Sequence, residues 1–211
     1  NSQDHNGKSV LEIGCSMGGI LKYFKDKGWN VSGVDLDDEY ISYGKDKLGV
    51  SISTGTIHDI QIDTIPDLII INHVFEHLLD PNKDLKKLHS IVDENTIIYV
   101  SVPGVMKMTK KKEVDFLRYL QNAHIYYFGL KSLVNLFQIN SFKLIYGDEG
   151  IRAIFKKNKN IAESPIIQSC YDETKSALLS HESIYLKYSS FPWIITTLPK
   201  VFFVKIRTRY R

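Results

Sequence analysis

The sequence predicts an α/β protein built on a doubly wound, mostly parallel sheet of seven strands. Over roughly the first three-quarters of the chain, short apolar runs alternate with segments whose apolar residues recur at helical spacing. Strands joined by crossover helices in a parallel sheet produce this alternation. The last two runs have only Gly147–Gly150 between them, which is too short for a crossover helix. They are therefore expected to pair as an antiparallel hairpin at one edge of the sheet.

The first strand–helix–strand unit can be followed residue by residue. Four apolar or near-apolar positions at 10–13 predict a buried strand. Apolar residues at helical spacing follow, and Gly28 stops that helix. The next apolar run, 31–34, predicts a second strand that ends at Asp35.

The next elements lead to the centre of the sheet. Residues 37–48 have a helical pattern that ends at Gly49, and 50–53 is expected to be a short third strand. The run 67-DLIIINHV-74 is continuous and rich in β-branched residues. Strands buried on both faces of a parallel sheet have this composition, so the run is the expected fourth strand.

The second half of the domain continues the alternation. A helix is expected over 82–92, a fifth strand over 97–103 and another helix over 130–139. The runs 142–147 and 151–157 supply the two strands of the hairpin. Together these elements make the predicted seven-stranded sheet.

The composition changes after about residue 158, so we divide the chain into a domain of residues 1–158 and an extension of residues 159–211. The extension is expected to contain a long helix over 163–188. The segment 191-FPWIITTLPKVFFVKIRTRYR-211 is apolar and aromatic and then basic, which suits the surface of an anionic membrane. The alternative is a helix that packs on the domain or on a second subunit.

The bulk composition narrows the class of protein. Hydrophobic residues make up 43% and charged residues 24%, and the net charge of +3 is too small to indicate nucleic acid. No apolar run reaches the roughly 18 residues of a membrane span, and no signal peptide is visible. The two cysteines, Cys15 and Cys170, lack metal spacing, so the expected location is the cytoplasm, with peripheral membrane contact through 191–211 as an addition.

The segment 10-VLEIGCSMGG-19 has the form of a loop that admits a nucleotide. Small residues at Gly14, Ser16 and Gly18 allow close backbone approach at the end of the first strand. Asp35 lies 21 residues past Gly14 and can accept hydrogen bonds from both ribose hydroxyls. Dinucleotide sites and S-adenosylmethionine sites share both features.

Three residues favour S-adenosylmethionine over a dinucleotide. Glu12 precedes the loop and would repel a pyrophosphate, whereas S-adenosylmethionine carries a cationic ammonium and a sulfonium. Ser16 stands where the dinucleotide fingerprint has its middle glycine. Asp59, in 58-HDI-60, follows the third strand and can accept a hydrogen bond from an adenine amino group.

From about residue 9 to 157 the sequence resembles the class I S-adenosylmethionine-dependent methyltransferases. Their acid-x-Gly-x-Gly-x-Gly motif matches this loop, with Ser16 as the one departure. The resemblance implies a Rossmann-like sheet that ends in an antiparallel hairpin, and it assigns Asp35 to the ribose, Leu36 to an adenine face and Asp59 to the adenine amino group. The expected cofactor-binding residues are Glu12, Gly14, Cys15, Ser16, Gly18, Asp35, Leu36, Asp59, Ile60, Asn72 and His73.

Two further segments resemble one subgroup of that family. The stretch 72-NHVFEHLLDP-81 is similar to the His-x-x-Glu-His-x-x-Asp-Pro signature of methyltransferases of ubiquinone biosynthesis and sugar modification. The stretch 124-HIYYFGLKSLVNLFQINSF-142 is similar to the histidine, aromatics and helix that precede the sixth strand there. The resemblance implies O-methylation of a small-molecule or glycan acceptor, and the expected acceptor is a sugar of cell-surface polysaccharide. N-methylation of an amino sugar and methylation of a quinone-like ring stay open.

Methyl transfer to a hydroxyl needs a base, and histidine suits that role near neutral pH. His77, just past the fourth strand, and His124, in the loop after the fifth, are the catalytic candidates. The alternative for His77 is that its ring caps or packs the start of the next helix beside Pro81, and for His124 it is an ordinary loop position among aromatic residues. For His73 we expect contact with the cofactor and not catalysis.

The acceptor side offers two weaker signals. Residues 105–123 are expected to cover the acceptor, and their basic segment 107-KMTKKK-112 favours an acidic acceptor, such as a sugar that bears a phosphate or carboxylate. A solvated loop explains the lysines equally well. Glu76 and His77 can bind a divalent ion, as the ubiquinone-type relatives suggest, but two adjacent ligands make a poor site without a third. We therefore assign no metal.

Two other classes of function fit parts of the sequence. An NAD-dependent oxidoreductase is disfavoured by Glu12, Ser16 and the 72–81 segment. A non-catalytic methyltransferase-like module stays open, because the chain opens at Asn1 without methionine and we expect residues upstream. Nucleic acid is not expected as substrate, because 72-NHVF-75 lacks the Asn/Asp-Pro-Pro-aromatic motif typical of enzymes that methylate exocyclic amines of nucleic acids.

Overall fold

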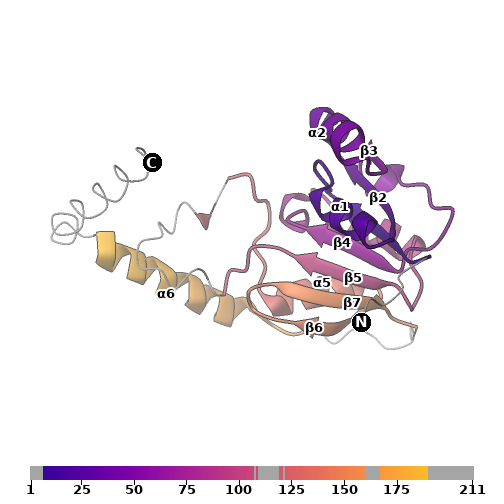
Figure 1. Cartoon of the computed structure of the whole chain (residues 1–211). Helices are drawn as coiled ribbons and strands as arrows, with labels where there is room; N and C mark the ends of the chain where they lie inside the picture. The colour runs from indigo at the N-terminus through magenta and orange to yellow at the C-terminus, as the bar shows by residue number, and fades with distance from the viewer. Residues whose placement is uncertain (1–6, 107, 109–118, 121, 160–166, 190–211) are drawn as a thin grey trace, which may run out of the picture.

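The computed structural model describes residues 7–106, 108, 119–120, 122–159 and 167–189. They form a seven-stranded sheet in the order β3-β2-β1-β4-β5-β7-β6 (Figure 1). The strands are β1 (Ser9–Ile13), β2 (Asn30–Asp35), β3 (Ile52–Thr54), β4 (Leu68–Asn72), β5 (Ile97–Ser101), β6 (Phe142–Gly147) and β7 (Arg152–Lys157). The strands β1 to β5 pair in parallel, and β7 pairs antiparallel with both β5 and β6. The predicted α/β fold and its hairpin are confirmed.

Helices cover the two faces of the sheet with separate apolar clusters. On one face, α1 (Gly19–Asp26) and α2 (Asp38–Tyr43) contribute Leu21 and Ile41 to a cluster with Val10 of β1. On the other, α3 (Pro81–Ser90) and α5 (Leu130–Ile139) contribute leucine and phenylalanine side chains to the larger cluster. The strand β1 is buried on both faces and lies between β2 and β4. The loop that follows β1 therefore lies in the inner part of the sheet edge at which the parallel strands end.

Short irregular helices refine two of the predicted elements. The expected helix 37–48 is α2 followed by a π-helical turn, η1 (Gly44–Leu48), before Gly49 ends it in the left-handed region at φ 63°. At Gly44, a Cβ atom would lie 2.4 Å from the carbonyl oxygen of Met17, so only glycine fits where the helix meets the loop after β1. The altered helical turn therefore lies against the predicted nucleotide loop.

The predicted fourth strand is shorter than the apolar run that predicted it. It ends at Asn72, because His73 takes a left-handed conformation with φ 57° that a strand cannot continue. A 3₁₀ turn, η3 (Phe75–His77), follows, and a similar turn, η2 (Ile57–Asp59), follows β3. The sequence pattern did not predict either turn, although both carry candidate site residues.

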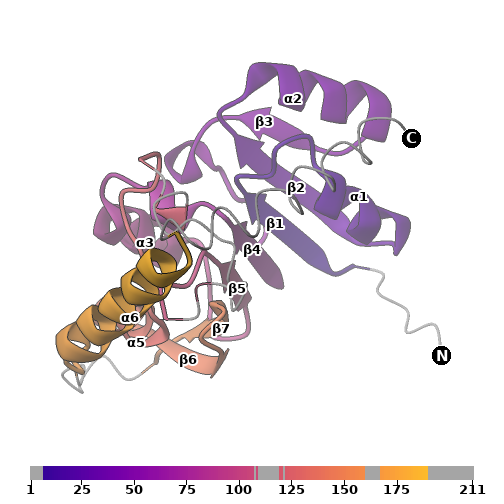
Figure 2. The ribbon, with the colours of Figure 1, turned by 90° about the vertical axis from the view of Figure 1, so that its left-hand side faces the viewer.

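The helix of the extension, α6 (Tyr171–Ser189), starts later than predicted. Residues 167–170 are not helical, which corrects the expected start at 163. A Lys131–Glu173 ion pair at 2.6 Å and two hydrogen bonds between Asn135 and Gln168 attach its start to α5 (Figure 2). Such contacts do not test the division at residue 158, which stays a prediction.

The C-terminal segment 191–211 lies outside the described residues, so its proposed membrane contact also stays a prediction. Within the described ranges, no helix combines the length and apolar character needed to cross a bilayer.

Candidate functional site

The loop after β1 is fastened to the end of β2. The backbone N–H groups of Gly14 and Cys15 both donate to the carbonyl oxygen of Val34, at 2.8 and 3.0 Å. Gly14 has φ 73°, and a Cβ there would lie 2.3 Å from Cγ2 of Val74. A side chain at Gly14 would therefore be strained by its backbone and blocked by its neighbour.

Asp35 organises the mouth of this loop. One carboxylate oxygen accepts a hydrogen bond from the N–H of Ser16 at 2.7 Å, and the other accepts from the N–H of Asp37 at 3.0 Å. Ser16 has φ 48°, so it keeps the left-handed backbone that a glycine would adopt readily. Ser16, which stands where the family motif has its middle glycine, thus adds a side chain but keeps the left-handed turn.

Gly18 closes the loop at the start of α1. It is the N-cap of that helix, with φ 80°, and a Cβ there would lie 2.7 Å from Cγ2 of Val50. Glycine is therefore required here both by the left-handed backbone and by the packing of the loop against Val50.

Glu12 lies beneath the loop as a buried acid. It is 3% exposed, and its Oε2 has no hydrogen-bond partner among the described residues. Burial, followed by the nearby charge of Asp35, raises the pKa of Glu12 to about 8. A cation that approaches this carboxyl would favour its ionised form.

The predicted adenine-binding residues lie at the ends of β2 and β3. Leu36 is 75% exposed and offers an apolar surface, whereas Ile60 is buried in the core. Asp59 accepts hydrogen bonds from the N–H and hydroxyl of Thr56, both at 2.8 Å, and these bonds lower the pKa of Asp59. Because the side chain of Ile60 packs in the core, its predicted contact with the adenine would have to use its backbone.

Cys15 is also placed inside the core. Its side chain is buried in the cluster that contains Leu21 and Val50, and burial raises the pKa of its thiol to about 12. The predicted cofactor contact of Cys15 is therefore restricted to its backbone, and burial disfavours the thiolate form of its side chain.

A second group of candidates lies past β4, at the same edge of the sheet. Glu76 is 1% exposed, and its Oε1 lies 3.1 Å from Nδ1 of His73. Its Oε2 has no hydrogen-bond partner among the described residues. The His73 ring, in contrast, is more than half exposed. Asn72, the last residue of β4, brings this group next to the loop after β1.

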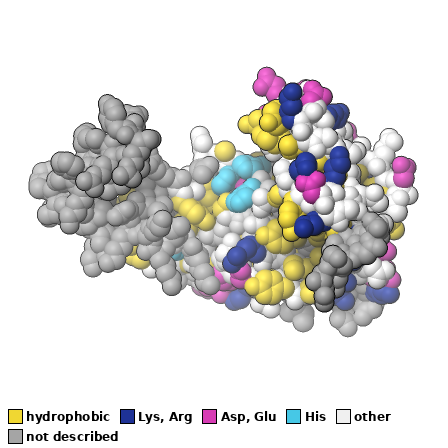
Figure 3. All heavy atoms as spheres, viewed as in Figure 1, with side chains coloured by type: hydrophobic (Ala, Val, Ile, Leu, Met, Phe, Trp, Pro, Cys, Tyr) yellow, Lys and Arg dark blue, Asp and Glu magenta, His cyan; other side chains and the backbone are white. Residues whose placement is uncertain are grey.

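The structure brings the two predicted catalytic histidines together. The ring centroids of His77 and His124 lie 4.8 Å apart, and Nδ1 of His77 donates to the carbonyl oxygen of Ala123 at 2.9 Å. The carbonyl oxygen of Glu76 accepts from the N–H groups of Ile125 and Tyr126, which binds the two segments to each other. Histidine side chains gather on the face seen in Figure 3.

Of the two alternatives for His77, capping of the following helix is wrong, whereas packing beside its start is not tested. Asp80 is the N-cap of α3, and its carboxylate accepts from the N–H of Lys83 at 3.0 Å. Ligand atoms of Glu76, His77 and His124 lie within 4.8 Å of one another, so the structure supplies the third group that the sequence pattern lacked.

The predicted acceptor lid is described in part. The hydroxyl of Tyr119 donates to the carbonyl oxygen of Gly104 at 2.8 Å. Of the basic segment 107–112, only Met108 falls among the described residues, and it is buried. The preference for an acidic acceptor therefore stays a prediction.

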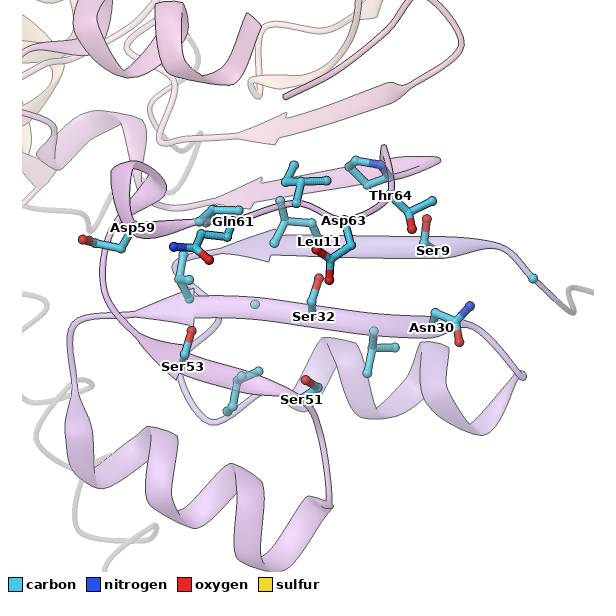
Figure 4. A pocket seen from close by; sticks show the side chains of 18 residues that line it. Ser9, Leu11, Asn30, Ser32, Ser51, Ser53, Asp59, Gln61, Asp63 and Thr64 are labelled. Atoms are coloured by element: carbon cyan, nitrogen blue, oxygen red, sulfur yellow. The ribbon is translucent and has the colours of Figure 1, made fainter. Parts of the chain in front are cut away.

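A hollow of about 600 Å³ lies on the sheet face that carries Leu11 and Val34 (Figure 4). Its polar lining includes the labelled Ser9, Asn30, Ser32, Ser51, Ser53, Gln61, Asp63 and Thr64. It reaches Asp59 at one end but includes none of Gly14, Ser16 and Asp35. It is therefore separate from the loop at the strand ends.

Comparison with known proteins gives a family for this arrangement. Residues 2–146 match the family model described as a methyltransferase domain. The chain is 28% identical over 120 residues to an uncharacterized methyltransferase of Staphylococcus carnosus, an alignment that covers 56% of each protein. It is 29% identical over 107 residues to a probable (S)-tetrahydroprotoberberine N-methyltransferase 2 of Papaver bracteatum, covering 47% of this chain and 30% of that protein. The chain thus spans about half or less of the curated relatives that it matches.

A solved structure shares the fold. The crystal structure of a putative S-adenosylmethionine-dependent methyltransferase from Listeria monocytogenes superposes with a TM-score of 0.56 at 17% identity. The superposition covers 74% of this chain and 94% of that one. At this identity the likeness concerns the fold.

Proposed function

This chain belongs to the methyltransferase-domain family, and from that premise we propose that it transfers a methyl group from S-adenosylmethionine to a small-molecule or glycan acceptor. The observation that carries the proposal is the carboxylate of Asp35, which two backbone N–H groups hold at the mouth of the loop after β1. Each oxygen accepts one N–H and keeps capacity for a ribose hydroxyl.

The residues at the strand ends fit the proposed cofactor. At Gly14 and Gly18 a Cβ would collide with Val74 and Val50, so only glycine lets the loop pack this tightly at the strand ends. Beneath the loop, Oε2 of Glu12 is buried without a hydrogen-bond partner among the described residues, and an approaching cation would stabilise the ionised form of Glu12. The exposed Leu36 offers an apolar surface for a base. When bound, S-adenosylmethionine supplies a methyl group already activated on a sulfonium.

The task left to the chain is to position the acceptor and to take up its proton. The segment past β4 and the loop 123–126 lie at the same edge, where Glu76, His77 and His124 meet. We propose the hydroxyl of a sugar as acceptor and O-methylation as reaction, within polysaccharide or related biosynthesis in the cytoplasm. This part rests on the resemblance of residues 72–81.

A small-molecule amine is the second candidate acceptor. The similarity to the Papaver bracteatum N-methyltransferase favours it. The same edge of the sheet suits either acceptor, because an ammonium must also lose a proton before its nitrogen can attack.

Calorimetry with S-adenosylhomocysteine tests the cofactor site, and an acceptor screen follows with isotopically labelled S-adenosylmethionine and mass detection. We expect micromolar binding and transfer of label to members of a panel of sugars, sugar phosphates and amines. Binding without transfer to any of them would favour the non-catalytic module. Binding of NAD(H) in place of S-adenosylhomocysteine would favour the oxidoreductase.

A further inference from the structure

We propose that His73, oriented by the buried carboxylate of Glu76, is the base that takes the acceptor's proton. The inference rests on the proposed function and makes it more specific. Sequence reasoning placed His73 against the cofactor and the base at His77 or His124, whereas hydrogen bonding and exposure favour His73. Glu76 is then a positioning residue, because it acts through the His73 ring.

Among the described residues, only Nδ1 of the His73 ring lies within hydrogen-bond distance of another group. Oε1 of Glu76 lies 3.1 Å from Nδ1 of His73, and a buried carboxylate favours a donor there. The proton therefore resides on Nδ1, and Nε2 carries the lone pair. Within the described ranges, Nε2 has no hydrogen-bond partner, and the His73 side chain is 58% exposed.

His77 is the alternative base, and its ring makes different contacts from those of His73. Its Nδ1 faces the carbonyl of Ala123 at 2.9 Å, and its Nε2 lies 4.0 Å from Oε1 of Glu76. Because Nδ1 donates to a carbonyl, Nε2 of His77 also carries a lone pair, and at 4.0 Å it makes no hydrogen bond to Glu76. The His77 side chain is 45% exposed against 58% for His73, and its ring packs edge-on against that of His124, so His73 is the more accessible of the two.

The backbone of His73 has an unusual conformation. Its φ of 57° is uncommon for a residue other than glycine, and its N–H donates to the carbonyl oxygen of Ser101 at 2.8 Å. Such strained positions persist where the surroundings fix them, and they cluster at functional sites. Here the strain turns the chain at the end of β4, next to the predicted cofactor loop.

In the proposed step, the methyl group moves from sulfur to the acceptor. A bond forms between the acceptor oxygen or nitrogen and the methyl carbon as the carbon–sulfur bond breaks, and its electron pair stays on sulfur. The acceptor's proton passes to Nε2 of His73, and the resulting imidazolium faces the Glu76 carboxylate through Nδ1.

The tautomer of His73 is the direct test. The full chain, labelled with ¹⁵N in its seven histidines and saturated with S-adenosylhomocysteine, is examined by long-range ¹H–¹⁵N correlation under mildly alkaline conditions. His73→Asn assigns the signal, since asparagine tolerates the left-handed backbone. We expect the proton on Nδ1, with this preference weakened in Glu76→Gln and unchanged in His181→Gln. A proton on Nε2 in the wild-type protein would overturn the proposal, because that nitrogen could not then accept another.

Kinetics on an acceptor from the screen provide the second test. His73→Asn should lower kcat by about 100-fold or more while KM for S-adenosylmethionine changes little. Added imidazole should restore part of the rate of His73→Gly, and His77→Gln should lose less than His73→Asn. Wild-type kcat in His73→Asn would overturn the assignment of the base, whereas a wild type that binds no S-adenosylhomocysteine would instead count against the proposed function.

Discussion

The backbone N–H of Ser16 donates a 2.7 Å hydrogen bond to the carboxylate of Asp35. This bond joins the loop after β1 to the end of β2, so the conformation of the loop and the position of the carboxylate depend on each other. Since the loop is expected to admit the cofactor and the carboxylate to bind its ribose, this bond connects both parts of the proposed site.

Replacing Asp35 should therefore weaken binding of S-adenosylhomocysteine. We expect Asp35→Ala to raise the Kd at least tenfold, about 1.4 kcal/mol, because both the ribose acceptor and the support of the loop are lost. Calorimetry measures the change. Asp26→Ala, which removes an exposed carboxylate paired with Lys22, is the matched control and should bind as the wild type does. Equal affinity in Asp35→Ala would place the ribose elsewhere.

Gly14 and Val74 offer a test of the close approach between the loop and the segment after β4. Gly14→Ala should lower the free energy of unfolding by about 2 kcal/mol or more, since its φ is 73° and its Cβ would lie 2.3 Å from Cγ2 of Val74. Urea unfolding of Gly14→Ala, Val74→Ala and the double variant separates the two causes.

These three variants form a double-mutant cycle with the wild type. The double variant should lose about 1 kcal/mol less free energy of unfolding than the sum of the losses in the two single variants, because alanine at 74 removes the collision but not the backbone strain. Strict additivity would show that the two residues do not meet.

The strands could be predicted because their side chains are buried in the sheet, and a run of apolar residues indicates a buried strand. The ends of the strands could not. His73 and Ser16 both adopt left-handed backbone conformations. The N–H of His73 donates to Ser101 and that of Ser16 donates to Asp35, and these partners are distant in the sequence.

The candidate site shows the same division. The motif placed Asp35 and Glu12 correctly at the strand ends, but it could not show that Cys15 and Ile60 direct their side chains into the core. It also gave no signal for the contact between Glu76 and His73, which depends on the 3₁₀ turn after β4.

Removal of metal ions should leave the protein's binding properties unchanged. Ligand atoms of Glu76, His77 and His124 lie within 4.8 Å of one another, a looser grouping than the roughly 3.4 Å between ligands that each lie about 2.1 Å from a tetrahedral zinc ion. In addition, Oε1 of Glu76 already contacts His73. We expect equal affinity for S-adenosylhomocysteine before and after dialysis against a chelator. Submicromolar binding of Zn²⁺ that His124→Ala abolishes would contradict this expectation.

Glu12 should make the stability of the protein depend on pH. Its pKa is raised from 4.5 to about 8, chiefly by burial. Between these two values the folded protein holds a proton on Glu12 that the unfolded chain has lost. The contribution of Glu12 is therefore fully present below about pH 4.5 and is lost as the pH rises toward about 8.

Glu12→Gln removes this contribution, because the amide stays neutral at every pH. The free energy of unfolding of the variant, relative to wild type, should rise between about pH 5 and about pH 8.5 by a few kcal/mol, since each unit of pKa corresponds to about 1.4 kcal/mol. Urea unfolding at the two pH values measures the difference, and other titrating groups cancel because both proteins share them. Glu39→Gln, an exposed glutamate in the first turn of α2, should show no such rise. Parallel pH profiles for wild type and Glu12→Gln would mean that Glu12 ionises at its ordinary pKa. Its carboxyl would then be ionised in the folded protein without a bound cation.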